Sequence, residues 1–244
     1  MVDVKIEDSV CFLTFKGKGR LNLLGRELFE ELERPLEETR DERARVVILR
    51  GHGDIFSAGI DLNEMKEFSS EEAESFIRLL DGTMKKVMSL PKPVIAQIRG
   101  YCLGGGLELA LSCDIRVASE NSSFGLPEIR VGVPSVIKAS LLLPTVGIGR
   151  ARELILTGET INAEEALRIG LVNKLSPDDR LDEDTMEMAR KFLKLSPYIV
   201  QVQKEVLYRW ISSLDEQSIK AFSLCFRTHY PRRWMEAFLE KREP

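Results

Sequence analysis

Three consecutive glycines followed by a glutamate have the clearest chemical use in this sequence. Gly104, Gly105 and Gly106 precede Leu107 and Glu108 at the expected start of a helix. Backbone N–H groups without side chains at a helix start can approach a ligand oxygen closely, and the helix dipole favours negative charge there. Glu108 follows Gly105 by three residues, so its carboxylate and that N–H share one helix face. The pattern predicts a centre that polarises a ligand oxygen beside a carboxylate.

Two other loops carry residues that suit the same chemistry. Ala58 and Gly59 are small residues in the loop of residues 51–61, and the Ala58 N–H is a candidate second donor. Paired donors on a developing oxyanion are often the largest single catalytic contribution. Glu128, in the loop of residues 123–128, supplies a second carboxylate. Two carboxylates around one polarised carbonyl suit proton transfer or the holding of a water.

Strands that alternate with helices are expected to position these loops. The apolar pattern predicts a two-stranded ribbon over residues 2–16 that closes near Asp8 and Ser9, and then an amphipathic helix over 25–39. The elements expected next are strand 45–49, helix 71–90, strand 94–98, helix 105–112 and strand 115–118. Such alternation implies parallel pairing through right-handed crossovers. Because the carboxyl ends of parallel strands share one rim, we expect the three loops to meet there.

Composition and missing motifs exclude several other classes of protein. The 244 residues are 43% hydrophobic with a net charge of −4, and no basic stripe suits nucleic acid or anionic lipid. The four cysteines lack CxxC spacing, and no export signal or 18-residue apolar run occurs, which indicates a cytoplasmic protein without membrane spans. Two histidines leave few parts for a zinc site or a Ser-His-Asp triad, and His52 is interpreted as a loop residue.

Each of these features has an ordinary explanation when it stands alone. The glycine run is also what a tight strand-to-helix turn requires, and a single glutamate is most often a solvated surface charge. Their joint occurrence at three successive strand ends favours a functional site.

Residues 54–61, 100–114 and 124–132 closely resemble the three signature blocks of the enoyl-CoA hydratase/isomerase (crotonase) family. The resemblance extends nearly end to end. It implies an α/β protein with a crotonase-like ββα superhelix, in which residues 1–180 form the core with the acyl-CoA site and residues 181–244 form a helical C-terminal trimerisation region. It also implies a homotrimer or a dimer of trimers, and a place in fatty acid metabolism such as β-oxidation.

The resemblance also implies roles for particular residues. The thioester carbonyl of an acyl-CoA is expected between the backbone N–H groups of Ala58 and Gly105. The segment of Ala58, Gly59, Ile60 and Asp61 is expected to line the bound coenzyme A together with Gly105. No metal is expected, and no cofactor beyond the coenzyme A that the substrate carries.

Relatives with glutamates at both matching positions hydrate trans-2-enoyl thioesters. The resemblance therefore implies an enoyl-CoA hydratase in which Glu108 activates a water and Glu128 protonates the α carbon. One alternative is an enoyl-CoA delta-isomerase or another crotonase-type lyase, in which one carboxylate shuttles a proton without water. A further alternative is a crotonase-fold binding or scaffold protein that has lost turnover.

Two segments depart from the family pattern. Residues 134–139 read Pro-Ser-Val-Ile-Lys-Ala where many hydratases have Pro-Gly-x-Gly-Gly-Thr. We expect this change to alter the backbone near the water site. Residues 229–234 replace a stretch that resembles Glu-Asp-x-x-Glu-Gly, which is expected to change subunit contacts or the coenzyme entrance. Residues 63–90 are expected to wall the acyl tail, without a readable code for its length.

Overall fold

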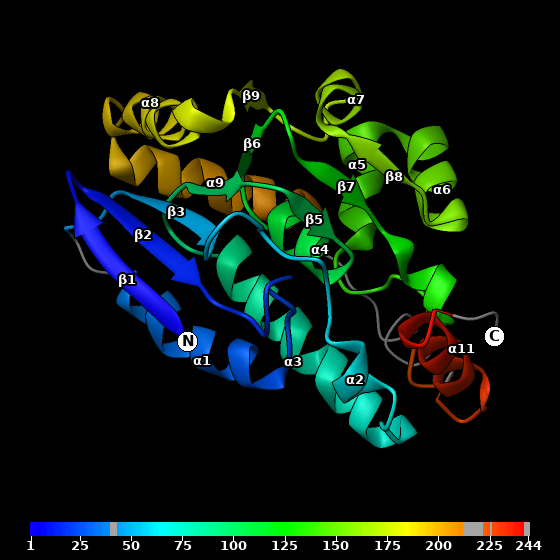
Figure 1. Cartoon of the computed structure of the whole chain (residues 1–244). Coiled ribbons are helices and arrows are strands. Elements are labelled where there is room, and N and C mark those ends of the chain that lie inside the picture. The colour runs from blue at the N-terminus through cyan, green and yellow to red at the C-terminus, as the bar shows by residue number, and fades with distance from the viewer. Residues whose placement is uncertain (40–42, 212–221, 225, 242–244) are drawn as a thin grey trace.

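The structure is a computed structural model that describes residues 1–39, 43–211, 222–224 and 226–241. At its centre is a sheet with the strand order β1-β2-β3-β4-β6-β9 (Figure 1). These strands are β1 (Val2–Glu7), β2 (Val10–Phe15), β3 (Val46–Gly51), β4 (Val94–Ile98), β6 (Ile115–Ser119) and β9 (Lys174–Ser176). β1 pairs with β2 antiparallel, and every later pair in this sheet is parallel. The predicted ribbon and the predicted parallel sheet are both confirmed.

The ribbon closes where the sequence predicts. Asp8 and Ser9 have φ angles of +49° and +63°, so both central residues of the turn are left-handed. This conformation suits a two-residue hairpin turn, because its twist matches that of the flanking strands.

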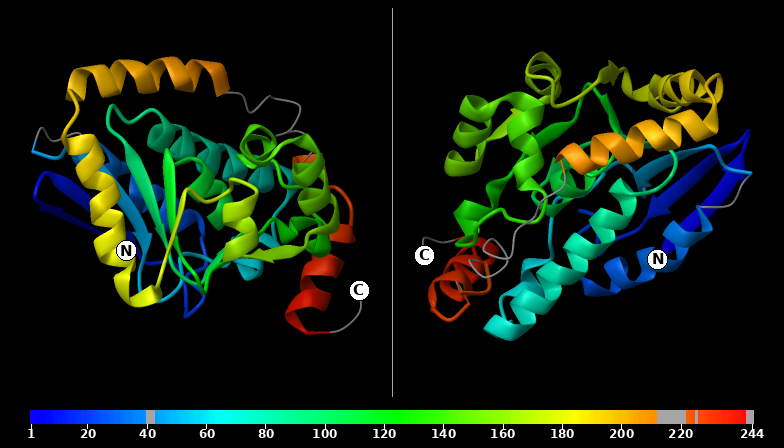
Figure 2. Two further views of the ribbon diagram at one scale, coloured as in Figure 1. Left: turned by 90° about the horizontal axis from the view of Figure 1, so that it is seen from above. Right: turned by 180° about the vertical axis from the view of Figure 1, so that it is seen from behind.

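Helices cover both faces of the sheet, as Figures 1 and 2 show. α1 (Arg26–Glu38) and α3 (Ser70–Met88) pack on one face, and α8 (Leu181–Leu193) packs on the other. In β3, Val47 belongs to the core on the side of α1 and α3, whereas Ile48 belongs to the cluster that includes α8 residues. A strand covered on both faces has to be apolar at successive positions, which explains its continuous hydrophobic run.

A second, smaller sheet corrects part of the sequence interpretation. β5 (Tyr101–Leu103), β7 (Ser123–Gly125) and β8 (Thr160–Asn162) form it, so two segments expected to be loops contain short strands. Three-residue strands are too short to show an alternating pattern. They matter for the site because β5 and β7 pair in parallel, and an isolated bridge joins Ser57 to Cys102 of β5. Backbone ladders therefore hold all three candidate loops in register.

Further helices follow along the chain, most of them short. They are α2 (Leu62–Met65), α4 (Gly105–Leu111), η1 (Pro127–Val131), η2 (Ala139–Leu141), α5 (Leu142–Val146), α6 (Ile148–Thr157), α7 (Ala163–Arg168), η3 (Asp178–Arg180), α9 (Pro197–Ile211) and α11 (Tyr230–Leu239). No helix in the described part of the chain is both long and apolar enough to cross a membrane. The division into a core of residues 1–180 and an oligomerisation region of residues 181–244 stays a prediction, and residues 212–221, 225 and 242–244 of that region lie outside the described residues.

Candidate active site

The three loops meet at one cavity of about 410 Å³, as expected for loops at one rim of a parallel sheet. Residues from α2, α3 and α11 complete its largely apolar wall. All of the site residues predicted from the sequence line this cavity: Ala58, Gly59, Ile60, Asp61, Gly105, Glu108 and Glu128. The structure thus brings together side chains and backbone groups that are up to 70 positions apart in the chain.

The glycine run is required by the packing at the start of α4. Gly104 has a φ of +52°, and a Cβ at this position would stand 3.0 Å from Oε1 of Glu128. A Cβ at Gly106 would stand 2.8 Å from Cβ of Ser57. The tight-turn explanation is therefore correct, and the same turn brings the helix start against the loops that carry Ser57 and Glu128. The site explanation stays a prediction.

The two predicted oxyanion donors differ in their hydrogen bonds. The Gly105 N–H, at the first residue of α4, donates no hydrogen bond among the described residues. It is therefore available to a ligand oxygen. The Ala58 N–H donates to the backbone oxygen of Leu21 at 3.0 Å. A thioester oxygen at Ala58 has to share or replace this carbonyl, and the role of Ala58 as second donor stays a prediction.

Glu108 is deeply buried, with 1% of its surface exposed. Its Oε1 accepts hydrogen bonds from the backbone N–H groups of Lys138 and Ala139, each at 2.9 Å. Burial and the negative charge of Glu128 raise the pKa of Glu108 to about 8, and the N–H groups of the 137–139 segment act in the opposite direction. A carboxyl with this pKa exchanges a proton near neutral pH.

Glu128 faces the same cavity from η1 and is partly exposed. Its Oε2 accepts a hydrogen bond of 2.7 Å from the Ser135 hydroxyl. Burial raises the pKa of Glu128, while the Ser135 hydrogen bond lowers it because the hydroxyl favours the ionised carboxylate. With both pKa values raised, Glu108 and Glu128 form a coupled pair that is expected to hold one proton between them near neutral pH.

Sequence reasoning did not assign roles to Ser135, Lys138 and Ala139. They belong to the 134–139 segment, which departs from the family pattern, so the departure was visible although its purpose was not. In the structure this short segment supplies a hydroxyl to one carboxylate and two N–H groups to the other. The expectation that the changed sequence alters the backbone near the water site, relative to other hydratases, stays a prediction.

Asp61 has a structural task in addition to its place in the cavity wall. Its side chain caps α2 by accepting from the Asn63 N–H at 3.0 Å, and it pairs with Lys18 at 2.5 Å. The Lys18 contact holds the 58–61 loop beside the 18–24 segment. Backbone hydrogen bonds of Leu24 with Gly59 and Asp61 join the same two segments. The expected contact of Asp61 with coenzyme A stays a prediction.

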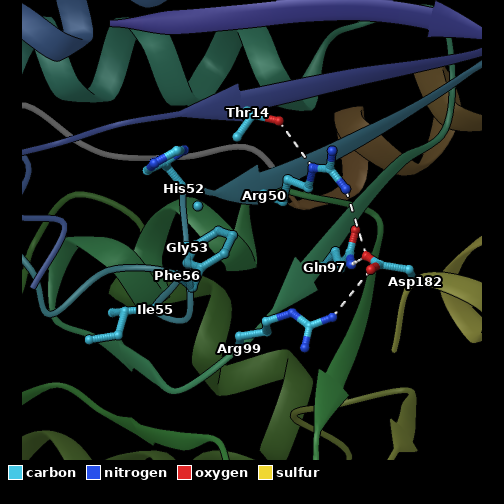
Figure 3. A pocket seen from close by; sticks show the side chains of 10 residues that line it. Thr14, Arg50, His52, Gly53, Ile55, Phe56, Gln97, Arg99 and Asp182 are labelled. Atoms are coloured by element: carbon cyan, nitrogen blue, oxygen red, sulfur yellow. Dashed lines mark hydrogen bonds and ion pairs between the residues drawn. The ribbon is translucent and has the colours of Figure 1, made fainter. Parts of the chain in front are cut away.

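His52 lies away from the glutamates, beside a second pocket of about 240 Å³ (Figure 3). Its side chain is exposed, in agreement with the interpretation as a loop residue. The two arginines of this pocket, Arg50 and Arg99, lie 3.7 Å and 3.4 Å from the carboxylate of Asp182, which Gln97 also contacts. This network connects α8 to the ends of β3 and β4, and Asp178, 3.1 Å from Arg99, supplies a second carboxylate to it.

The second departing segment, residues 229–234, starts α11. Trp234 packs against Gly132, just after η1, with its Cβ 3.2 Å from the position of a Cβ at that glycine. Phe238 and Leu239, later in α11, line the cavity. The segment therefore carries a helix to the mouth of the site, whereas its effect on coenzyme entry or subunit contacts stays a prediction. Among the described residues no three His, Cys, Asp or Glu side chains come together as metal ligands.

Comparison with known proteins finds the same organisation in relatives. The short-chain-enoyl-CoA hydratase of Clostridium acetobutylicum is 37% identical over 97% of this chain and 94% of its own. The crystal structure of an enoyl-CoA hydratase from Bacillus anthracis has a TM-score of 0.82 and 34% identity, covering 100% of this chain and 97% of its own. A methylmalonyl-CoA decarboxylase structure has a TM-score of 0.85 and 26% identity, covering 100% and 96%. These likenesses confirm the crotonase-like α/β fold.

A model of the enoyl-CoA hydratase/isomerase family matches residues 5–244, nearly the whole chain. The three signature blocks that carry the resemblance contain the loops that meet at the cavity. The family match, the fold and the arrangement of these loops together show that the chain belongs to the enoyl-CoA hydratase/isomerase family.

Proposed function

We propose that this protein is an enoyl-CoA hydratase, a hydro-lyase that adds water across the 2,3 double bond of a short trans-2-enoyl-CoA. The observation that carries the proposal is the placement of two carboxyls with raised pKa values, Glu108 and Glu128, in one cavity with the Gly105 N–H, which donates to no described residue. The 37% identical relative named a short-chain-enoyl-CoA hydratase supports both the reaction and the short acyl chain.

The backbone donors hold the thioester in this proposal. The Gly105 N–H binds the carbonyl oxygen, and the Ala58 N–H joins it once the Leu21 oxygen shares or yields that bond. Donors already in place stabilise the enolate-like negative charge as it forms, because they need not reorganise. The coenzyme A part of the substrate lies along the segment from Ala58 to Asp61, past α11.

The two glutamates transfer protons during turnover, and the number of protons that the two carboxyl groups carry together does not change. The shared proton rests mainly on Glu108, whose pKa is raised to about 8, and it passes through the water between the carboxyls to Glu128 to give the reactive form. In that form Glu108, as the carboxylate, takes a proton from a water held between the pair, and the hydroxyl forms the new bond to the β carbon. Glu128, as the acid, gives its proton to the α carbon as the enolate collapses. The pair carries one proton before and after turnover, and exchange through water between the two carboxyls restores the starting state. No cofactor or metal takes part beyond the coenzyme A of the substrate.

The direct test is hydration of crotonyl-CoA by the purified protein and its variants. We expect E108Q and E128Q each to lower turnover by roughly 10²-fold or more, because each removes one of the proton-transferring groups. E120Q is the matched control, since Glu120 is an exposed glutamate on the loop that precedes β7 and does not line the cavity. Wild-type turnover in both E108Q and E128Q would sink the mechanism.

The same assay separates the remaining alternatives. Labelled oxygen from solvent water enters the product of a hydratase and not that of a delta-isomerase. Because a methylmalonyl-CoA decarboxylase shares the fold, methylmalonyl-CoA is tested alongside crotonyl-CoA. A scaffold protein that has lost turnover is indicated by tight coenzyme A or protein binding without acceleration of any acyl-CoA reaction.

We also propose that the chain acts as a homotrimer or a dimer of trimers in the cytoplasm. Exposed apolar side chains on the C-terminal helices support an assembly, among them Tyr198 and Ile199 of α9 and Phe238 of α11, which are 70%, 60% and 58% exposed. Light scattering should give three or six times the chain mass of 27.7 kDa. A monomer at working concentration contradicts the assembly.

A further inference from the structure

A buried ion pair lies behind Glu108. Nζ of Lys138 donates to Oδ1 of Asp81 in α3 at 2.7 Å, and the two side chains are only 5% and 6% exposed. Lys85, which is 44% exposed, also contacts Asp81 at 2.6 Å. The removal of two charges from water costs free energy that their mutual attraction repays only in part, so such a pair is weak support for stability by itself. A role in fixing the geometry of neighbouring groups is a better explanation.

Lys138 connects this pair directly to the site. Its side chain contacts Asp81 of α3, while its backbone N–H holds Oε1 of Glu108 on α4. Ala139, the next residue, gives its N–H to the same oxygen. Lys138 does not line the cavity, so it acts on Glu108 from behind and not on the substrate.

The segment that carries these donors has few backbone bonds of its own. Residues 134–137 lie between η1 and η2, and in the described chain they make no backbone–backbone hydrogen bond. Ile137 and Ala139 pack in the core, and the contact of Lys138 with Asp81 adds an ion pair that attaches the segment to α3.

We propose that Lys138 is a positioning residue, whose ion pair with Asp81 fixes the 137–139 segment so that the N–H groups of Lys138 and Ala139 hold the Glu108 carboxylate in line for proton transfer. The inference rests on the proposed hydratase function and names the device that aligns one of its carboxylates. An error of about 1 Å in the placement of a reacting group can cost 10²-fold in rate.

Breaking the Lys138–Asp81 pair should affect Glu108 through the N–H groups of Lys138 and Ala139. They favour the ionised form of Glu108, against burial and the facing carboxylate of Glu128. If the segment loosens, the pKa of Glu108 rises and the alkaline limb of the pH–rate profile moves to higher pH. Because Lys138 and Asp81 do not line the cavity, KM for crotonyl-CoA is expected to stay within about twofold while kcat falls about tenfold or more.

The test uses K138M, D81N and the double variant. Methionine keeps most of the length of lysine, and Asp81 then retains Lys85 as a partner, so no buried carboxylate is left alone. Both single variants should lower kcat and move the alkaline limb upward. The double variant should be no slower than the slower single variant, because both changes break the same interaction. K138R, which keeps the charge, should recover most of kcat.

K204M is the matched control. Lys204 of α9 is also a largely buried lysine, 9% exposed, and it pairs with Asp114 at 2.6 Å away from the cavity. It should lose stability but keep wild-type kcat and pH profile. Wild-type kcat in K138M and D81N overturns the proposal. A loss of kcat in K204M as large as that in K138M also overturns it. If K138M does not fold, D81N and the double variant carry the same comparison.

Hydrogen exchange measured by mass spectrometry separates this proposal from the hydratase assignment. In the wild type, the amides of Lys138 and Ala139 are hydrogen-bonded, and the peptide that contains them should be protected. Its exchange should be about tenfold faster in K138M and D81N but not in K204M. Unchanged exchange overturns the positioning role even if the enzyme hydrates enoyl-CoA. Faster exchange supports it even if crotonyl-CoA is not a substrate, in which case only the proposed function fails.

Discussion

Replacement of Ser135 by alanine should narrow the pH range in which the enzyme works. In the proposed mechanism the active form of the Glu108–Glu128 pair carries one proton, so kcat/KM is bell-shaped in pH. The alkaline limb reports loss of that proton and lies near pH 8, because the pKa of Glu108 is raised to about 8. The acid limb reports a second proton, which the pair gains mainly at Glu128.

The size of the effect follows from one hydrogen bond. The Ser135 hydroxyl donates to Oε2 of Glu128 at 2.7 Å and lowers the pKa of that carboxyl. A hydrogen bond to a charged group contributes about 1.5–3 kcal/mol. Since one pKa unit corresponds to about 1.4 kcal/mol, S135A should move the acid limb upward by about 1 to 2 pH units. The alkaline limb should move much less, so the bell becomes narrower from its acid side.

The assay is the initial rate of crotonyl-CoA hydration across the pH range at substrate concentrations well below KM, which reports free-enzyme pKa values. S140A is the control, because Ser140 lies in the same part of the chain but is exposed. It should leave both limbs in place. An unmoved acid limb in S135A, or the same movement in S140A, refutes the assignment of Ser135 to Glu128.

Three other changes have expected outcomes. The pKa of Glu108 is about 8 in the folded chain against an ordinary value of 4.5, so its stabilising contribution is complete below about pH 4.5 and is lost as the pH rises to about 8. E108Q should therefore gain stability over wild type across this window, by at most about 5 kcal/mol in urea unfolding at fixed protein concentration. A stability difference that stays constant with pH contradicts this linkage. G104A should lose about 1 kcal/mol or more and much of kcat, because the new Cβ meets Glu128 at a strained φ, whereas G149A, where a Cβ meets nothing within 4 Å, should do neither. Treatment with a chelator followed by desalting should leave hydration unchanged, and loss of activity that an added metal restores contradicts the metal-free mechanism.

Much of the fold was predictable because its signals are local. The hydrophobic run of β3, the apolar spacing of α1 and the turn at Asp8 and Ser9 each follow from the preferences of a few neighbouring residues. The parallel sheet followed from their order, and with it the meeting of three loops at one cavity. The three-residue strands β5, β7 and β8 were missed because so short a segment cannot show the alternating hydrophobic pattern of a strand. Such a segment becomes a strand only when the fold places the edge of another strand beside it.

The sequence by itself determined the family, the glycine run with Glu108, and Glu128 as its partner, because these are residue types at fixed spacings within signature blocks. The tertiary structure decided how the two carboxylates are held. It assigned Ser135 to Glu128 and the N–H groups of Lys138 and Ala139 to Glu108, and it placed Lys138 against Asp81, 57 residues earlier. It also showed that the Ala58 N–H is already engaged by Leu21. Most of these contacts join segments that are distant in the chain. Such hydrogen bonds form only when packing brings the two groups together, and no local pattern encodes that.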